Sequence, residues 1–176
     1  MLAAIASAWL CSLYTPPGET VLSGVEGTRQ LIARAEAVVW VTGARTARPK
    51  DIEKAPVEWQ PAGAGPPNVV AFDVHGVLKG ESVPRVIIVE GTVSDADDFN
   101  EYSVPYPGVR SEGRKGSCFA DVYKRGGQFL LLLVRAGANR YTPYWAPLLP
   151  VNEQIRGTSD PWLAWVRNEI ASQRGA

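Results

Sequence analysis

The sequence is poor in the side chains from which most metal and catalytic centres are built. It contains one histidine, His75, and two cysteines, Cys11 and Cys118, which are too far apart for a C-x-x-C motif. One histidine and two distant sulfurs do not form a four-ligand zinc site. Eighteen basic residues balance eighteen acidic ones, so no long-range field attracts nucleic acid or an anionic membrane. We therefore expect no cofactor, no metal and no nucleic-acid partner.

Long apolar runs are also missing. A membrane-spanning helix needs about 20 apolar residues, whereas the longest such run here, residues 129–134, has the length of a strand. The chain has seventeen glycines and fourteen prolines, a composition that favours a β domain with irregular connections over a helical bundle. We expect one domain over residues 9–176, with a helical extension from about residue 150.

The first residues have features of an export signal. Residues 1–8 are apolar and end in Ala-Ser-Ala, the small-x-small pattern that signal peptidase cleaves. Residues 1–8 are therefore interpreted as the remnant of a signal peptide, and the protein as secreted or periplasmic, with no membrane association after cleavage. An ordinary apolar N-terminal strand or helix is the alternative interpretation.

Export would place Cys11 and Cys118 in an oxidising compartment, where they could form one disulfide. Closing a loop of about 100 residues restricts the unfolded chain strongly in the chain-entropy model. Two buried thiols or a redox pair are the alternatives.

Hydrophobic periodicity predicts a mainly β chain with a helix near each end. The segment 27–36 has the spacing of a short amphipathic helix. A second helix is expected after Asp160, because an acidic capping residue precedes Pro161 and apolar residues then recur at intervals of three and four. Residues 124–127 are expected to form a tight turn. The expected strands cover residues 37–43, 68–79, 85–89, 118–123, 128–134 and 141–145.

Three motifs in this order resemble the netrin-like modules, which include the tissue inhibitors of metalloproteinases. The motifs are A-E-A-V-V at residues 35–39, V-x-F-x-V-x-x-V-L-K-G at residues 70–80 and Y-K-x-G-x-x-F-L-L at residues 123–131. The resemblance implies a five-stranded OB-like β-barrel, closed or partly open, with one short N-terminal helix and one C-terminal amphipathic helix.

The resemblance does not extend to the group that inhibits proteases in that family. The inhibitors begin with a Cys-x-Cys pair whose terminal amino group and carbonyl chelate the protease zinc. Here Leu13 replaces the second cysteine, and Trp9 and Leu10 precede Cys11 after the expected cleavage. Metalloprotease inhibition is therefore an alternative that the sequence disfavours.

Two polar groups are weak candidates for chemistry. Asp73 precedes His75 by two positions on one strand face and could orient its imidazole in a hydrolase, but no nucleophile motif accompanies the pair. A solvated strand face is the preferred interpretation. An acidic cluster also lacks the pattern of a calcium loop, so we expect it to be hydrated; its members are Asp95, Asp97, Asp98 and Glu101.

An aromatic tract near the C-terminus is the strongest candidate for binding. Aromatic rings and amides are common in ligand and partner grooves, and prolines at positions 143, 147 and 150 are expected to keep this segment extended as an exposed edge. The function predicted is that of a non-enzymatic binding or interaction module. Its candidate residues are Tyr141, Tyr144, Trp145, Asn152, Glu153 and Gln154, whereas the helical spacing of Trp162 and Trp165 favours their interpretation as anchors of the last helix.

Overall fold

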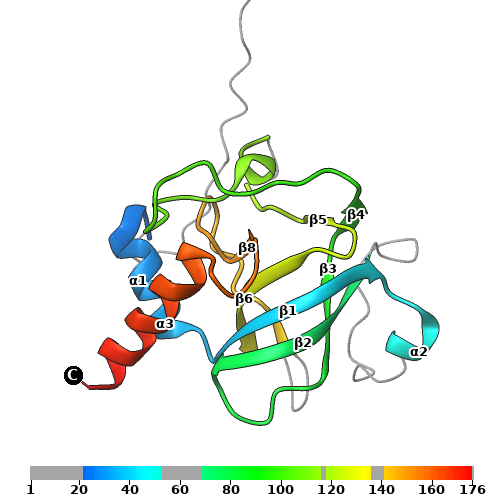
Figure 1. Cartoon of the computed structure of the whole chain (residues 1–176), viewed down its shortest axis with the longest axis horizontal. Coiled ribbons are helices and arrows are strands. Elements are labelled where there is room, and N and C mark those ends of the chain that lie inside the picture. The colour runs from blue at the N-terminus through cyan, green and yellow to red at the C-terminus, as the bar shows by residue number, and fades with distance from the viewer. Residues whose placement is uncertain (1–21, 53–68, 116–117, 136–140, 176) are drawn as a thin grey trace, which may run out of the picture.

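The computed structural model describes residues 22–52, 69–115, 118–135 and 141–175. Over these residues the chain is mainly β, with helices near both ends (Figure 1). The helical elements are α1 (Gly24–Arg34), α2 (Pro49–Ile52), the 3₁₀ turn η1 (Ser111–Arg114) and α3 (Pro161–Arg174). The strands are β1 (Ala37–Thr46), β2 (Val69–Lys79), β3 (Val86–Glu90), β4 (Thr92–Ser94), β5 (Val122–Lys124), β6 (Gln128–Arg135), β7 (Tyr141–Pro143) and β8 (Asn152–Ile155).

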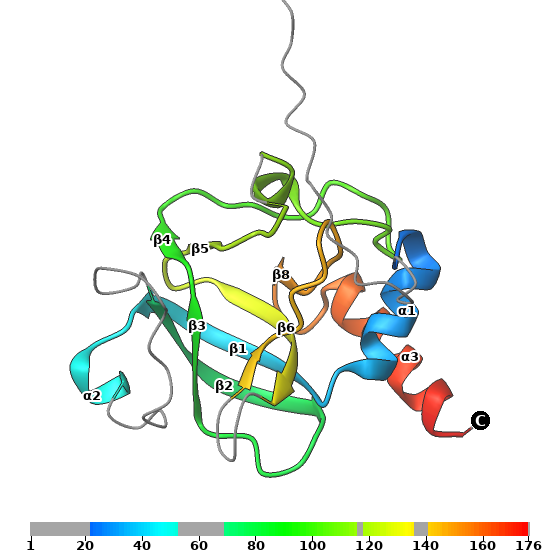
Figure 2. The same ribbon diagram turned by 180° about the vertical axis from the view of Figure 1, so that it is seen from behind.

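The main sheet is antiparallel, and within the described residues it has six strands. The order is β3-β2-β1-β6-β7, and β8 pairs with the part of β6 that β7 leaves free. Strands β1 and β2 pair through three register shifts, and such bulges bend a strand and increase its twist. The sheet curls (Figures 1 and 2) until β3 and β7, its outer strands, approach each other. No closed ring of strand pairings is present in the described part of the chain, so the closed form of the expected barrel is not shown.

Two apolar cores lie on the two faces of the curled sheet. Leu130 and Leu132 of β6 belong to the core under α1 and α3, while Phe129, Leu131 and Leu133 belong to the core inside the curl. Because successive residues of a strand face opposite sides, burial on both faces explains why β6 is apolar without alternation. Figures 1 and 2 show α1 and α3 side by side at one end of the sheet. None of the helices in the described ranges has the length and apolarity to cross a membrane.

Most predicted elements are confirmed, with shifted ends. The helix near the N-terminus, the strand pair β2–β3, strand β6 and the last helix all form. The tight turn expected at residues 124–127 is present, with the N–H of Gly127 bonded to the carbonyl of Lys124. The strand expected before it is shorter: β5 begins only at Val122 and pairs in parallel with β4, a strand that the sequence did not indicate. Cys118 cannot begin an extended strand because its φ is 66°.

Helix α3 begins as its sequence predicts. Asp160 is the N-cap, and its carboxylate accepts hydrogen bonds from the backbone N–H of Trp162 at 2.9 Å and from that of Arg156 at 2.8 Å. Pro161 occupies the first turn, where its missing N–H costs nothing. The cap is buried, so water cannot replace it easily.

We predict that Asp160→Ala lowers the free energy of unfolding by about 1–2 kcal/mol, because it removes an N-cap acceptor from a buried helix end. Asp160→Asn keeps one side-chain oxygen and should cost less. Urea unfolding followed by circular dichroism measures both variants. Equal stability of the alanine variant and the wild type would contradict this role.

Candidate functional site

The amide and carboxyl residues predicted to form an exposed edge are buried. Asn152, Glu153 and Gln154 lie on β8 and pair with Leu131, Leu130 and Phe129 of β6, and all three side chains are at most 4% exposed. The prediction of an exposed edge is therefore wrong. Although prolines precede it, this segment does not lie at the surface. Its backbone instead pairs with the edge of β6 that β7 leaves free.

Arg110 lies at the centre of a buried polar network that includes two of these residues. Its side chain is fully buried. Its guanidinium donates to Asp98 Oδ2 at 2.6 Å, to the carbonyl of Ala120 at 2.9 Å and to that of Asn152 at 3.2 Å. The backbone N–H of Arg110 donates to Glu153 Oε1 at 3.2 Å. A buried cation needs such a set of partners, because an unpaired one would be very costly.

The remaining members of the network hold the segment 95–115 against β8. Asn100 Nδ2 donates to Glu153 Oε2 at 2.9 Å, and Gln154 exchanges hydrogen bonds with the side chain of Asp97 and the backbone N–H of Asp98. Asn152 Nδ2 donates to the hydroxyl of Tyr123 at 2.8 Å. These contacts give the predicted binding residues an internal, structural role.

Three residues of the acidic cluster are paired with arginines, and the fourth, Asp97, accepts a hydrogen bond from the amide of Gln154. Asp95 contacts Arg125 at 3.0 Å, and Glu101 contacts Arg114 at 2.7 Å, while Asp97 and Asp98 belong to the network above. In the described ranges no three His, Cys, Asp or Glu side chains are grouped so that they could hold a metal ion.

Glu153 has an unusual proton affinity for a carboxyl. Burial raises its pKa to about 7, although Arg110 and the hydrogen bond from Asn100 act in the opposite direction. Burial also raises the pKa of the Tyr123 hydroxyl. Below pH about 4.5, Glu153 is protonated in both the folded and the unfolded chain. Between pH 4.5 and 7 only the unfolded chain releases this proton, so stability falls as the pH rises.

We predict that, relative to Glu153→Gln, the wild type loses about 3 kcal/mol of unfolding free energy between pH 4.5 and 8, at about 1.4 kcal/mol per pKa unit. The amide cannot titrate, so the difference between the two proteins isolates this group. Urea unfolding at several pH values measures it. A difference that is constant with pH, or that grows with pH, would contradict the raised pKa.

The two residues of the hydrolase hypothesis have separate partners. Both carboxylate oxygens of Asp73 bind the guanidinium of Arg45, at 2.7 and 3.1 Å. The imidazole of His75 instead packs against the indole of Trp40, with ring centroids 4.2 Å apart. Asp73 therefore binds an arginine, and among the described residues no carboxylate is hydrogen-bonded to His75.

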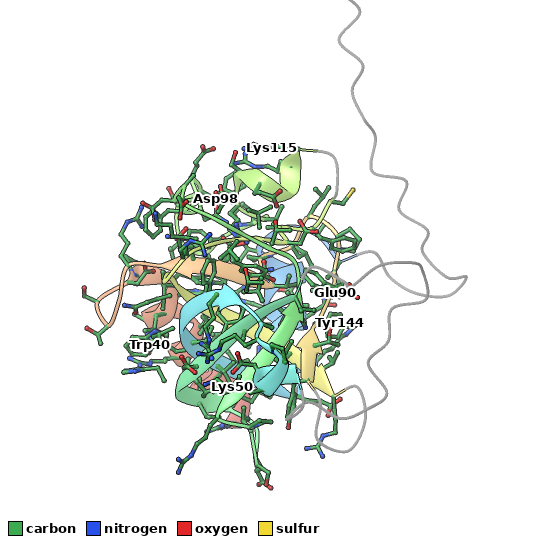
Figure 3. The ribbon with its side chains drawn as sticks, turned by 90° about the vertical axis from the view of Figure 1, so that its right-hand side faces the viewer. Trp40, Lys50, Glu90, Asp98, Lys115 and Tyr144 are labelled. Atoms are coloured by element: carbon green, nitrogen blue, oxygen red, sulfur yellow. The ribbon has the colours of Figure 1, made fainter. Side chains whose placement is uncertain are left out.

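The aromatic candidates divide into a buried and a half-buried group. Tyr141 is buried, and its hydroxyl donates to the carbonyl of Glu81 at 3.2 Å. Tyr144 and Trp145 are half-buried. The ring of Trp145 lies edge-on to the ring of Phe119, with the ring centroids 5.5 Å apart. Figure 3 shows Tyr144 near one margin of the molecule and Trp40 near the other.

Further exposed apolar residues, which the sequence did not indicate, lie on the segments that adjoin Trp145 and Phe119, because the N–H of Leu148 binds the carbonyl of Cys118 next to Phe119. Leu148 is 38% exposed and Tyr102 is 41% exposed. Gly108 lies between them, because a Cβ at this position would be 3.3 Å from the Tyr102 ring and 3.4 Å from the Leu148 carbonyl. We call this the aromatic surface; its members are Tyr102, Phe119, Trp145 and Leu148.

Cys118 adjoins the aromatic surface. It is buried, its carbonyl accepts from the N–H of Leu148 at 2.9 Å, and it is not a free thiol. Cys11 and the rest of the expected signal segment lie outside the described residues, so their pairing and the cleavage site stay predictions.

We predict that Cys11 and Cys118 form a disulfide in the exported chain, which then has two fewer hydrogen atoms by mass spectrometry without reductant than after reduction. Alkylation before reduction should leave both cysteines unlabelled. Two alkylated cysteines in the exported, unreduced protein would refute the bridge.

A second feature that the sequence did not reveal is a groove between β2 and α3. Its volume is about 250 Å³, and it combines residues almost a hundred positions apart. Such a site has no local signal, because it exists only where the strand and the helix pack together. Its lining residues are Gly76, Val77, Leu78, Arg167, Ile170, Ala171 and Arg174.

Comparison with protein-family models and with curated proteins gives no relative from which a role could be transferred. No protein-family model matches the chain, and no curated protein matches it significantly. The functional argument therefore rests on the contacts of the chain itself.

Proposed function

We propose that this chain is an exported, non-enzymatic binding module with an OB-like, netrin-like barrel, and that it binds a protein partner through the aromatic surface. The proposal combines the motif resemblance with one structural observation. That observation is the apolar exposure of Leu148 and Tyr102 around Gly108.

The strand order supports the OB-like part of the proposal. An OB fold is a five-stranded, partly open barrel. The order β3-β2-β1-β6-β7 provides five strands, and the hydroxyl of Tyr141 on β7 reaches the carbonyl of Glu81 in the connection from β2 to β3. The family-like motifs at residues 70–80 and 123–131 fall on β2 and on the segment from β5 to β6.

The backbone at Leu148 supports a binding role for the aromatic surface. Leu148 has a φ of 60°, a left-handed conformation that costs a residue with a Cβ about 1–2 kcal/mol. Its carbonyl accepts from Val109 at 2.8 Å, and its N–H donates to Cys118. Strained residues that are held firmly are concentrated at functional sites, and this one presents an apolar side chain to solvent.

The composition of the surface favours a protein over a small ligand. It is formed by half-buried and exposed rings on segments that are fixed by backbone hydrogen bonds. Rigid aromatic groups of this kind provide large contact area at little entropic cost and are common in the centre of protein interfaces.

We predict that Leu148→Asn combined with Tyr102→Ser weakens partner capture about tenfold or more, as expected when central apolar contacts are lost. Asparagine tolerates a positive φ, so the first change should not destabilise the fold. The immobilised protein is incubated with an extracellular extract, and each captured protein is quantified by mass spectrometry.

Lys50→Ser is the control, since Lys50 is an exposed residue of α2 and belongs to neither the aromatic surface nor the β2–α3 groove. It should leave capture unchanged. Equal capture by the wild type and the double variant, both with unchanged melting temperature, would refute the aromatic surface as the binding site.

A further inference from the structure

Strand β2 has an edge that no other strand of the described chain covers. Strand β3 pairs with β2 only from Val69 to Asp73, and the last backbone bond on this side joins the N–H of Val74 to the carbonyl of Arg85. Beyond Val74, β2 continues to Lys79 with β1 as its one partner within the described residues. An open edge of this kind can accept an additional strand.

The open edge adjoins the groove beneath α3. Val77 is 48% exposed, the most exposed large apolar side chain of the described residues. Leu78 lies beside it on β2, and Ile170 and Ala171 of α3 complete the apolar part of the lining. Arg174 donates to the carbonyl of Leu78 at 3.3 Å, which fixes the end of the helix against the strand.

The groove carries positive charge that the described residues do not neutralise. Arg167 and Arg174 line it, and Lys79 lines the adjoining pocket with Arg174. None of the three is in an ion pair within the described ranges, whereas Arg29, Arg45, Arg110 and Arg125 each are. Burial, and after it the charge of Arg174, lowers the pKa of Lys79, whose ammonium donates to the carbonyls of Ile32 and Ala33.

The spacing of the cations fits an extended chain. Arg167 and Arg174 are seven residues apart in α3, which is about 10 Å along the helix axis. An extended peptide rises about 3.3 Å per residue, so side chains at alternate positions point to the same side and lie about 7 Å apart. Two acidic side chains at alternate positions could therefore reach both arginines, whose long side chains span the remaining distance, while a neighbouring apolar residue contacts Val77.

We propose that the β2–α3 groove binds an extended acidic segment of a protein partner, which adds as a strand to the open edge of β2. The peptide backbone pairs with β2 on the side that faces away from β1. Its carboxylates bind Arg167 and Arg174, and an apolar residue covers Val77. This is strand addition, in which the backbone gives affinity and the side-chain pockets give specificity.

A peptide fits this groove better than a nucleic acid. Strand addition uses backbone N–H and C=O groups that a nucleic acid lacks. Nucleic-acid grooves combine a long basic track with exposed rings for base stacking, whereas the lining here contains no aromatic ring and its exposed apolar residue is a valine.

The test uses a fluorescein-labelled short peptide of alternating glutamate and valine, with matched glutamine–valine and lysine–valine peptides. Fluorescence anisotropy should show binding of the glutamate peptide alone, and weakening as salt is added, because exposed charges are screened. Hydrogen exchange of the intact protein should show protection of the Gly76 and Leu78 amides when this peptide is bound.

Variants of the intact chain separate the contributions. Arg167→Glu with Arg174→Glu should lower affinity about tenfold or more, and Val77→Thr should lower it by a smaller factor. The matched control is Lys50→Glu with Lys115→Glu, which reverses two exposed charges in α2 and after η1. The control should bind as the wild type does.

Four results would overturn the proposal. They are equal binding of the glutamine peptide, full affinity in the double arginine variant, no protection of the Gly76 and Leu78 amides, and displacement of the peptide by a single-stranded oligonucleotide or a sulfated oligosaccharide that binds more tightly. The Leu148 and Tyr102 variants should bind the glutamate peptide normally, so this proposal and the proposed function can fail independently.

Discussion

The arrangement of residues 95–115, residues 118–124 and strand β8 depends on one constraint, the burial of Arg110. Its guanidinium and N–H bind the carboxylates of Asp98 and Glu153 and the carbonyls of Ala120 and Asn152. These partners come from three segments that are distant in the sequence. Because a buried guanidinium must keep its partners, the segments 95–115 and 118–124 and strand β8 are fixed together around one side chain.

The same buried network positions the segments that carry the residues of the aromatic surface. Tyr102 lies on the segment that Arg110 and Asn100 hold to β8, and Phe119 is adjacent to the Ala120 carbonyl. Leu148 is tied to both segments by backbone hydrogen bonds. Asn152, Glu153 and Gln154, which the sequence predicted to bind a partner, therefore hold this surface in place from the interior. Of the four residues that form the surface, only Trp145 was predicted from the sequence to bind.

The other surface depends on the curl of the sheet. Strand β2 pairs with β1 through several bulges and extends beyond the end of its pairing with β3. Its last residues therefore lie beside α3 with β1 as their one strand neighbour in the described chain. The same end of the sheet receives α1 and α3, and the basic residues of α3 there have no acidic partner within the described ranges. Of the three large exposed apolar residues of the described chain, Tyr102 and Leu148 thus belong to the aromatic surface and Val77 to the β2–α3 groove.

Local signals determined much of this protein. The alternation along residues 69–79, the apolar run of β6 and the Asp160–Pro161 start of α3 predict their elements correctly, because strand faces, burial and helix caps depend on neighbouring residues. Only the tertiary structure decided that β5 pairs with β4, that Glu153 is buried beside Arg110, and that β2 meets α3 in a basic groove. These outcomes depend on packing between distant segments, for which no local sequence pattern exists.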